Sequence, residues 1–198
     1  MTENALFDAS GNRLYLNADE RAAFIEAARI AERSLKCFCH VLHYSGCRLS
    51  EALELTPRHV DLAEQSLRVR CLKKRGGKII YRYIPLPPAL LDSLDMVFGI
   101  REIQKRGQRK ELEALLWPWS RVHGWRLVKG IMDKAEIPDG AHKAPKGLRH
   151  GFGVNAIRNG IPLNMLQKWM GHADMKTTAI YANALGEEER QIAARMWG

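Results

Sequence analysis

The sequence lacks the features typical of secreted, membrane-inserted and repeat proteins. Its four cysteines among 198 residues are too few for a disulfide scaffold, which favours a reduced, cytoplasmic protein. No segment approaches the roughly 20 uncharged apolar residues that a membrane-spanning helix needs, and the N-terminus has neither the basic start nor the apolar run of a signal peptide. No internal repeat or low-complexity tract is present, and 46% of the residues are apolar, so we expect a packed core.

Acidic residues are scarce where basic residues gather. The formal net charge is +9, although residues 1–35 carry six acids against four bases. The stretch 68–82 holds seven basic residues and no acid: Arg68, Arg70, Lys73, Lys74, Arg75, Lys78 and Arg82. Such a stretch is attracted to polyanions, of which nucleic acid is the commonest and an anionic membrane surface the next. A solvated basic hairpin would carry the same charge.

Hydrophobic periodicity predicts a domain dominated by helix, with a small antiparallel sheet inserted early. Asn17 and Glu20 form a capping-box pattern. The helix that they begin has an apolar face made by Ala22, Ile25, Ala28 and Ala31. In 66–86, apolar and basic residues alternate on both sides of Gly76-Gly77, which predicts a β-hairpin. Further helices are expected at 34–44, 49–55, 88–98, 101–116, 122–135, 147–159, 162–170, 175–183 and 187–197. We divide the chain into an N-terminal segment, 1–16, and one domain, 17–198.

Four short stretches contain candidate functional residues: GCRLSEALEL at 46–55, LKKRGGK at 72–78, KGLRHGFG at 146–153 and MGHADMKTTAIYAN at 170–183. Each alone has an ordinary structural explanation. Arg48 could pair with Glu51, the lysine-rich turn could be plain surface, and Tyr181 could belong to the core. No single stretch therefore identifies a function.

Taken together, the order and spacing of these stretches resemble the tyrosine recombinase (phage integrase) family. That family has Arg in a T/S-G-x-R-x-S-E-L segment, Lys in a hairpin turn, then H-x-L-R-H, then L-G-H with Tyr nine residues after its His. The corresponding residues here are Arg48, Lys74, Arg149 with His150, His172, and Tyr181 nine residues after His172. The resemblance runs from about Leu16 to the C-terminus. It implies a mixed α/β, mainly α catalytic domain with a three-stranded antiparallel sheet.

The resemblance also implies a site-specific recombinase that cuts and rejoins DNA through a 3′-phosphotyrosine link, without metal, cofactor or ATP. Negative charge develops on the phosphate oxygens as a DNA strand is cut. Arg48 and Arg149 would stabilise that charge, because a guanidinium can bind two oxygens at once. Tyr181 would be the nucleophile, and the covalent link would conserve the bond energy for rejoining.

Further roles follow from the same resemblance. Lys74 would protonate the departing 5′-oxygen, with Lys73 and Lys78 as competitors. His172 would contact the phosphate or orient the nucleophile, and Glu51 would fix the cations of the site. The residues expected to contact DNA are Arg68, Arg70, Lys73, Arg75, Lys78 and Arg82.

One position departs from the family pattern. The family usually has His three residues before the second Arg, whereas this sequence has Lys146. A lysine supplies positive charge to the phosphate, but it is a poor base for the tyrosine proton unless its pKa is strongly lowered. His150 is another candidate base, although in relatives that histidine is more often a supporting residue. The identity of the general base is left open.

The run C-x-C-H-x-x-H at 37–43 requires a check for a zinc site. Cys37 with His40, or Cys39 with His43, would face the same way on a helix. The two pairs lie on different faces among apolar neighbours, so buried cysteines and structural histidines are the favoured interpretation. We expect no metal site.

The implied partners are double-stranded DNA and further copies of the chain, with no membrane. The family assembles as a tetrameric synapse in which the terminal helix docks on a neighbour, here through Ile192, Ala193 and Met196, although this helix could instead pack on its own domain. Relatives usually carry an N-terminal domain, for which no room exists before Arg48. We therefore expect a naturally short recombinase, similar to fimbrial phase-variation invertases, or an excised fragment. The alternatives are a type IB topoisomerase-like enzyme and a DNA-binding accessory module without catalysis.

Overall fold

The computed structural model describes residues 5–71, 80–183, 187–194 and 196–197. The predicted mixed, mainly α fold is confirmed. The α-helices are α1 (Ala18–Arg29), α2 (Arg33–Ser45), α3 (Leu49–Leu53), α4 (Pro88–Phe98), α5 (Ile100–Arg106), α6 (Arg109–Leu112), α7 (Arg121–Lys134), α8 (Pro145–Arg158), α9 (Leu163–Met170), α10 (Met175–Ala179) and α11 (Glu187–Ala194). The 3-10 helices are η1 (Pro57–His59) and η2 (Ile180–Asn183).

The sheet has three antiparallel strands in the order β1-β2-β3, namely β1 (Val60–Asp61), β2 (Ser66–Arg70) and β3 (Tyr81–Pro85). Its register pairs Arg70 with Tyr81. Along β2 and β3 alternate side chains are buried, as the period-two pattern predicted. The expected turn at Gly76-Gly77 lies outside the described residues.

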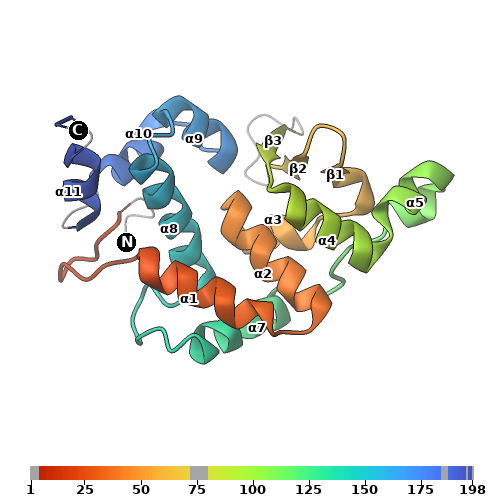
Figure 1. The fold of residues 1–198 in the computed structure, drawn as a ribbon, viewed down its shortest axis with the longest axis horizontal. Helices are drawn as coiled ribbons and strands as arrows, with labels where there is room; N and C mark the ends of the chain where they lie inside the picture. Colours follow the sequence, from red (N-terminus) through yellow and green to blue (C-terminus); the bar gives the residue numbers. More distant parts are fainter. Residues whose placement is uncertain (1–4, 72–79, 184–186, 195, 198) are drawn as a thin grey trace.

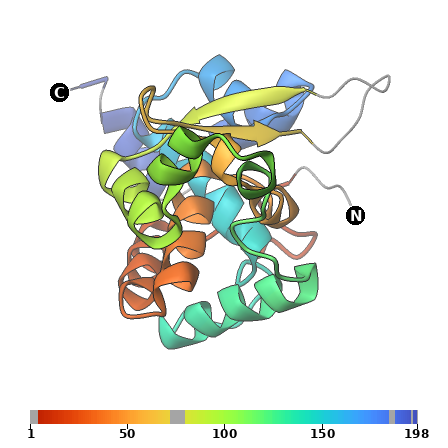
Figure 2. The same ribbon diagram turned by 90° about the vertical axis from the view of Figure 1, so that its right-hand side faces the viewer.

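The elements are arranged so that α2 and α8 pack together in the middle of the molecule. Helices α1 and α7 lie at one end and the sheet at the other (Figures 1 and 2). Helix α9 contacts β3, and α10, η2 and α11 follow beyond α8. The sheet, α8 and α9 thus border a common region.

The start of α1 is confirmed, and its predicted inner face is partly wrong. Asn17 and Glu20 form the capping box, with both side-chain to backbone bonds at 2.9 Å. However, Ala22 is exposed, while Phe24 is completely buried. The ring of Phe24 is the largest apolar group of this helix, so turning it inward removes more apolar surface from water than the predicted alanine would.

Two predicted helices end earlier than their patterns indicated. The helix expected over 101–116 stops at Gly107, whose φ of 67° is left-handed, and only the short α6 follows. The helix expected over 175–183 is regular only to Ala179 and continues as η2, which holds Tyr181.

The main core gathers around Phe38, whose ring lies 5.0 Å from that of Trp117. Cys37 and Cys39 are buried in this core, in agreement with the structural interpretation of the C-x-C-H run. In the part of the chain that the structure describes, no group of three or more His, Cys, Asp or Glu could hold a metal ion. Nor is any described helix both long enough and apolar enough to cross a bilayer.

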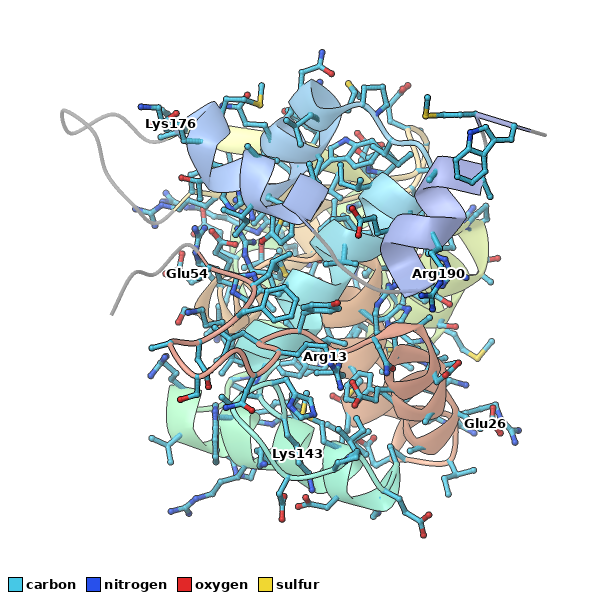
Figure 3. All side chains as sticks on the ribbon, turned by 90° about the vertical axis from the view of Figure 1, so that its left-hand side faces the viewer. Arg13, Glu26, Glu54, Lys143, Lys176 and Arg190 are labelled. Atoms are coloured by element: carbon cyan, nitrogen blue, oxygen red, sulfur yellow. The ribbon has the colours of Figure 1, made fainter. Side chains whose placement is uncertain are left out.

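The segment before α1 packs on the same face of the molecule as the C-terminal helix. Leu6 and Tyr15 join a second apolar cluster with Tyr181, and the Leu16 amide donates to the carbonyl of Gly147 at 3.0 Å. Figure 3 views this face, on which Arg13 of the segment and Arg190 of α11 both lie. The boundary predicted at residue 16 stays a prediction.

Candidate active site

Helix α8 places three of the predicted residues along one side of the site. It begins with Pro145. Proline fits the first position of a helix, because the amide proton that it lacks would have no hydrogen-bond partner within the helix there. Lys146, Arg149 and His150 follow and all line the same cleft. Lys146 is exposed, whereas Arg149 and His150 are buried.

Arg149 is anchored by contacts to two other segments of the chain. Its Nη1 donates to the carbonyl of Gly46 at 2.6 Å, and its Nη2 donates to the carbonyl of Met170 at 2.7 Å. Nη2 also lies 3.1 Å from Nε2 of His172. Burial lowers the pKa of Arg149 to about 10, with a further contribution from Arg48, so the guanidinium is charged at neutral pH. Its remaining N–H donors are available to an anion.

Two glycine turns present the carbonyls that hold Arg149. Gly46 ends α2 and Gly171 ends α9, and both have left-handed φ angles, of 58° and 64°. At Gly46 a Cβ atom would also lie 2.3 Å from the ring of Phe152, so no larger residue fits there. The G-x-R and G-H elements of the two motifs therefore have a structural basis in these turns.

Glu51 is a buried carboxylate that holds two arginines. It accepts from Nη1 of Arg48 at 3.0 Å and from Nη2 of Arg82 at 2.6 Å, and also from the Arg48 amide at 2.8 Å. Burial alone would raise the pKa of Glu51, but the hydrogen bond and charge of Arg82, with further help from Arg149, hold it below its ordinary value. The predicted supporting position of Glu51 beside Arg48 is what the geometry shows.

Arg82 is only 4% exposed, and its guanidinium is turned inward between Glu51 and the carbonyl of Trp169, to which Nε donates at 2.7 Å. The prediction that Arg82 contacts DNA stays a prediction, because its guanidinium is buried although it lines the cleft described below. Its burial follows from the two-residue period of a strand, which puts Arg82 on the same buried face as Ile84.

His172 lies directly after the Gly171 turn and bridges two parts of the site. Its Nε2 faces Arg149, and its Nδ1 lies 3.0 Å from Oγ1 of Thr178. Burial, and then the charges of Arg149 and Arg48, lower the pKa of His172 to about 3. The imidazole is therefore neutral at neutral pH, and both of its nitrogens are engaged.

Tyr181 is 1% exposed and lies on η2, facing α8. Its Oη is 3.1 Å from Nδ1 of His150, and its ring is parallel to that of His172, with centroids 6.2 Å apart. A Cβ atom at Gly153 would lie 2.5 Å from the tyrosine ring, so this glycine makes the space for it. Burial raises the pKa of Tyr181 to about 12, against the opposing charges of Arg149 and Arg48.

These side chains border one cleft of about 990 Å³, which also borders the sheet. Among the described residues that line it, six are lysines or arginines and one, Asp174, is acidic, so the cleft favours an anion. The basic lining residues are Arg48, Arg82, Arg121, Lys146, Arg149 and Lys168.

Arg121 of α7 and Lys168 of α9 belong to this cleft and were not predicted as site residues, nor was Trp125. Arg121 and Trp125 are one turn apart on α7, which places them on the same side of that helix. That spacing alone carries no functional signal in the sequence.

The hairpin residues are only partly described. The guanidinium of Arg68 lies 4.7 Å from the ring centroid of Tyr81, and Arg70 is 3.8 Å from the carboxylate of Glu54. Both arginines are partly exposed. Lys73, Lys74, Arg75 and Lys78 lie outside the described residues, so their predicted roles stay predictions.

The comparison with known families identifies the class. The model of the Phage integrase family matches residues 15–188, and the chain belongs to this family. The resemblance to tyrosine site-specific recombinases inferred from the four motifs is confirmed.

Among curated proteins, the chain is 27% identical over 194 residues to tyrosine recombinase XerD of Mycobacterium leprae (strain TN), a match that covers 90% of this chain and 59% of that protein. It is 28% identical over 186 residues to tyrosine recombinase XerD of Staphylococcus aureus (strain Mu50 / ATCC 700699), covering 89% of this chain and 60% of that protein. The chain thus spans about three-fifths of the length of these relatives.

Solved structures share the fold. The crystal structure of XerA recombinase aligns with a TM-score of 0.75 at 24% identity, over 93% of this chain and 65% of that chain. The catalytic domain of bacteriophage HP1 integrase aligns with a TM-score of 0.62 at 19% identity, over 90% of this chain and 93% of that chain. XerH site-specific recombinase bound to its difH substrate aligns with a TM-score of 0.70 at 19% identity, over 97% of this chain and 60% of that chain.

Proposed function

We propose that this chain acts as a site-specific DNA recombinase, which cleaves and rejoins DNA strands through a covalent 3′-phosphotyrosine link at Tyr181. The observation that carries the proposal is the meeting of Arg48, Arg149, His172 and Tyr181, from separate segments, in one cationic cleft. The relatives named tyrosine recombinase, and the XerH structure bound to DNA, support it.

In the proposed reaction Arg48 and Arg149 bind the oxygens of the scissile phosphate and stabilise the negative charge that develops there. Tyr181 attacks phosphorus, and the bond to the 5′-oxygen breaks. Lys74 donates a proton to that oxygen. Because guanidinium groups supply the positive charge and the phosphotyrosine conserves the bond energy, the reaction as proposed uses neither a metal ion nor ATP.

The proposed DNA surface consists of the cleft and the hairpin beside it. Arg68 and Arg70 extend from β2, and Lys73, Arg75 and Lys78 follow in the hairpin sequence. Most of these contacts would be to phosphates, which position the duplex without reading its sequence.

We propose further that copies of the chain assemble on DNA as a tetramer, with the C-terminal helix of one copy docking on the next. Helix α11 contacts α8 in the single chain. The residues after it, Met196 and Trp197, are 83% and 78% exposed. Two large apolar side chains exposed beside each other are suited to a protein partner.

The test of catalysis uses a pool of nicked duplexes with randomised sequence around the nick. The nick lets the cleaved fragment leave, so a covalent protein–DNA adduct accumulates and survives denaturation. We expect the wild-type protein to form the adduct and Tyr181→Phe to bind the same DNA without forming it. The matched control is Tyr44→Phe, which removes a hydroxyl from an exposed tyrosine that does not line the cleft and should keep the adduct.

Equal adduct yield from Tyr181→Phe and the wild type would remove Tyr181 from the mechanism. Once a cleaved site has been recovered from the pool, a plasmid carrying two copies of it separates two enzyme classes. A recombinase exchanges the paired sites, whereas a type IB topoisomerase relaxes any supercoiled plasmid.

A further inference from the structure

We propose that His150 accepts the proton of Tyr181 during strand cleavage, and that Lys146, at the position where the family usually has a histidine, acts only as a cation for the DNA phosphate. This inference rests on the proposed function. It assigns the general base, which the sequence left open between these two residues.

Geometry favours His150. Its Nδ1 lies 3.1 Å from Oη of Tyr181, and among the residues that the structure describes it is the only hydrogen-bond partner of that oxygen. The tyrosine ring is held by Gly153 on one side and by the parallel ring of His172. The hydrogen bond therefore joins two buried side chains whose positions are fixed by packing.

The neighbouring groups lack a free lone pair. Lys146 is exposed, and a protonated lysine has three N–H donors and no acceptor. His172 has both nitrogens occupied, because Nε2 accepts from Arg149 and Nδ1 faces the hydroxyl of Thr178. Arg149 cannot accept a proton at any working pH. In the tautomer that carries its proton on Nε2, Nδ1 of His150 is the acceptor that lies within reach of the phenol.

Burial and the neighbouring charges together decide the protonation of His150. Lys146 and Arg149 lie on the same helix, Tyr181 faces it from η2, and His172 lies beyond the tyrosine. Burial, and then Lys146 and Arg149, lower the pKa of His150 to about 4, so its imidazole is neutral and has a lone pair at neutral pH. A DNA phosphate in the cleft would bring negative charge and favour the imidazolium once it forms.

The proton and electron pairs balance in this step. As Oη of Tyr181 bonds to phosphorus, its O–H bond breaks and the proton moves to Nδ1 of His150. The phosphorus bond to the 5′-oxygen breaks, and that oxygen receives a proton from the general acid. In rejoining, the 5′-hydroxyl attacks phosphorus, its proton returns to the acid, and the imidazolium returns its proton to the tyrosine.

His150→Asn is the sharpest variant, because an asparagine side chain can place a polar atom near the position of Nδ1 but is not a base. We expect single-turnover cleavage of the nicked pool at saturating protein to fall by roughly 10²- to 10⁴-fold. DNA binding and thermal unfolding should stay close to wild type. In the wild type, cleavage should decline as pH falls through the pKa of His150, and this acid limb should be absent in the variant.

The matched change on the same helix face is Lys146→Gln. It should weaken DNA binding and its salt dependence while keeping the acid limb of the pH profile. Cleavage by His150→Asn at the wild-type rate, or loss of the acid limb in Lys146→Gln instead, would overturn the assignment.

Rescue adds a readout that a purely structural histidine would not give. A fluorinated tyrosine at position 181 is a more acidic phenol and depends less on a base, so it should restore part of the cleavage that His150→Asn loses. An equal effect of fluorination with and without His150 would contradict the proposal. A wild-type protein that forms no adduct would instead refute the proposed function itself.

Discussion

At the scale of single residues, the site depends on one buried carboxylate. Glu51 is 2% exposed and holds Arg48 toward the cleft and Arg82 in the interior. A buried ion pair is costly to break, because the partner that remains is left charged and without compensation.

Glu51→Gln is therefore expected to lower the free energy of unfolding by about 3 kcal/mol at neutral pH. Arg82 holds the pKa of Glu51 below its ordinary value in the folded state. The stabilisation is thus present above the ordinary carboxyl value and is lost as pH falls through the lowered folded value. Urea unfolding at neutral and acid pH should show that the free energy of unfolding falls less on acidification in the variant than in the wild type.

The control for Glu51 is Glu26→Gln, which breaks an exposed pair with Arg29 on α1. Exposed pairs contribute little to stability, so this variant should unfold like the wild type. If Glu51→Gln also unfolded like the wild type, the buried carboxylate would not be stabilising the site.

Single residues also show what the sequence could and could not predict. The motif placed Arg48 and Glu51 correctly beside each other. Glu51 is the third residue of α3, and the side chain at that position reaches back to the amide of the N-cap residue, Arg48. The burial of Arg82 was not predicted, because its charge was counted without considering which face of the strand it lies on. Its alternation with Ile84 on β3 already carried the signal that it points inward.

At the scale of elements, α8 is built so that Tyr181 can lie against it. Gly153 leaves the space that the tyrosine ring fills, and the same helix carries the ring's hydrogen-bond partner, His150. A side chain at this glycine has to displace either the ring or the helix.

Gly153→Ala is expected to push the ring of Tyr181 out of its seat, because the added Cβ would lie 2.5 Å from a ring carbon. Covalent adduct yield on the nicked pool should fall by at least about tenfold, since a misplacement of about an ångström can cost far more than that. Tyrosine fluorescence should show greater exposure of the ring.

Gly130→Ala is the matched control, because a Cβ atom there meets nothing within 4 Å. It lies inside α7, so the change should stabilise the protein by up to about 1 kcal/mol and leave the adduct yield unchanged. The same adduct yield from Gly153→Ala as from Gly130→Ala would mean that the space at Gly153 is not needed to position Tyr181 for cleavage.

Element boundaries were predictable where a cap or a glycine turn marks them. Asn17, Gly46 and Gly171 fixed the start of α1 and the ends of α2 and α9. Gly107 ends a charged helical pattern that looks continuous in the sequence. This end was not predictable, because a single glycine within a helix is tolerated and its left-handed conformation depends on the surrounding contacts.

At the scale of the whole molecule, part of the net positive charge is concentrated in the cleft. The cleft takes basic residues from several elements, including α7, α8 and α9. The charge pattern of the sequence predicted a basic, DNA-binding region at the hairpin. It did not predict that Arg121 and Lys168 line the cleft, because tertiary packing brings them there and no local sequence pattern encodes it.

Lys168→Gln should weaken DNA binding nearly uniformly across sequences and reduce the slope of log K against log salt by about 1, as expected when one phosphate contact is lost. The measurement is fluorescence anisotropy on a labelled duplex at several salt concentrations. Lys110→Gln removes the same charge from α6, away from the cleft, and should leave the slope unchanged. If both variants gave the same slope of log K against log salt, Lys168 would not contact the DNA and the duplex would not lie along this side of the cleft.

Arg149 ties the chemistry of this molecule to its integrity. The guanidinium that would hold the DNA also fastens the end of α2 and the end of α9 to the central helix, through the carbonyls of Gly46 and Met170. Opening either turn would therefore remove one of the hydrogen bonds that hold the Arg149 guanidinium in the cleft. Heat or denaturant that opens either turn should therefore reduce the proposed DNA cleavage together with the packing of α2 and α9 against α8.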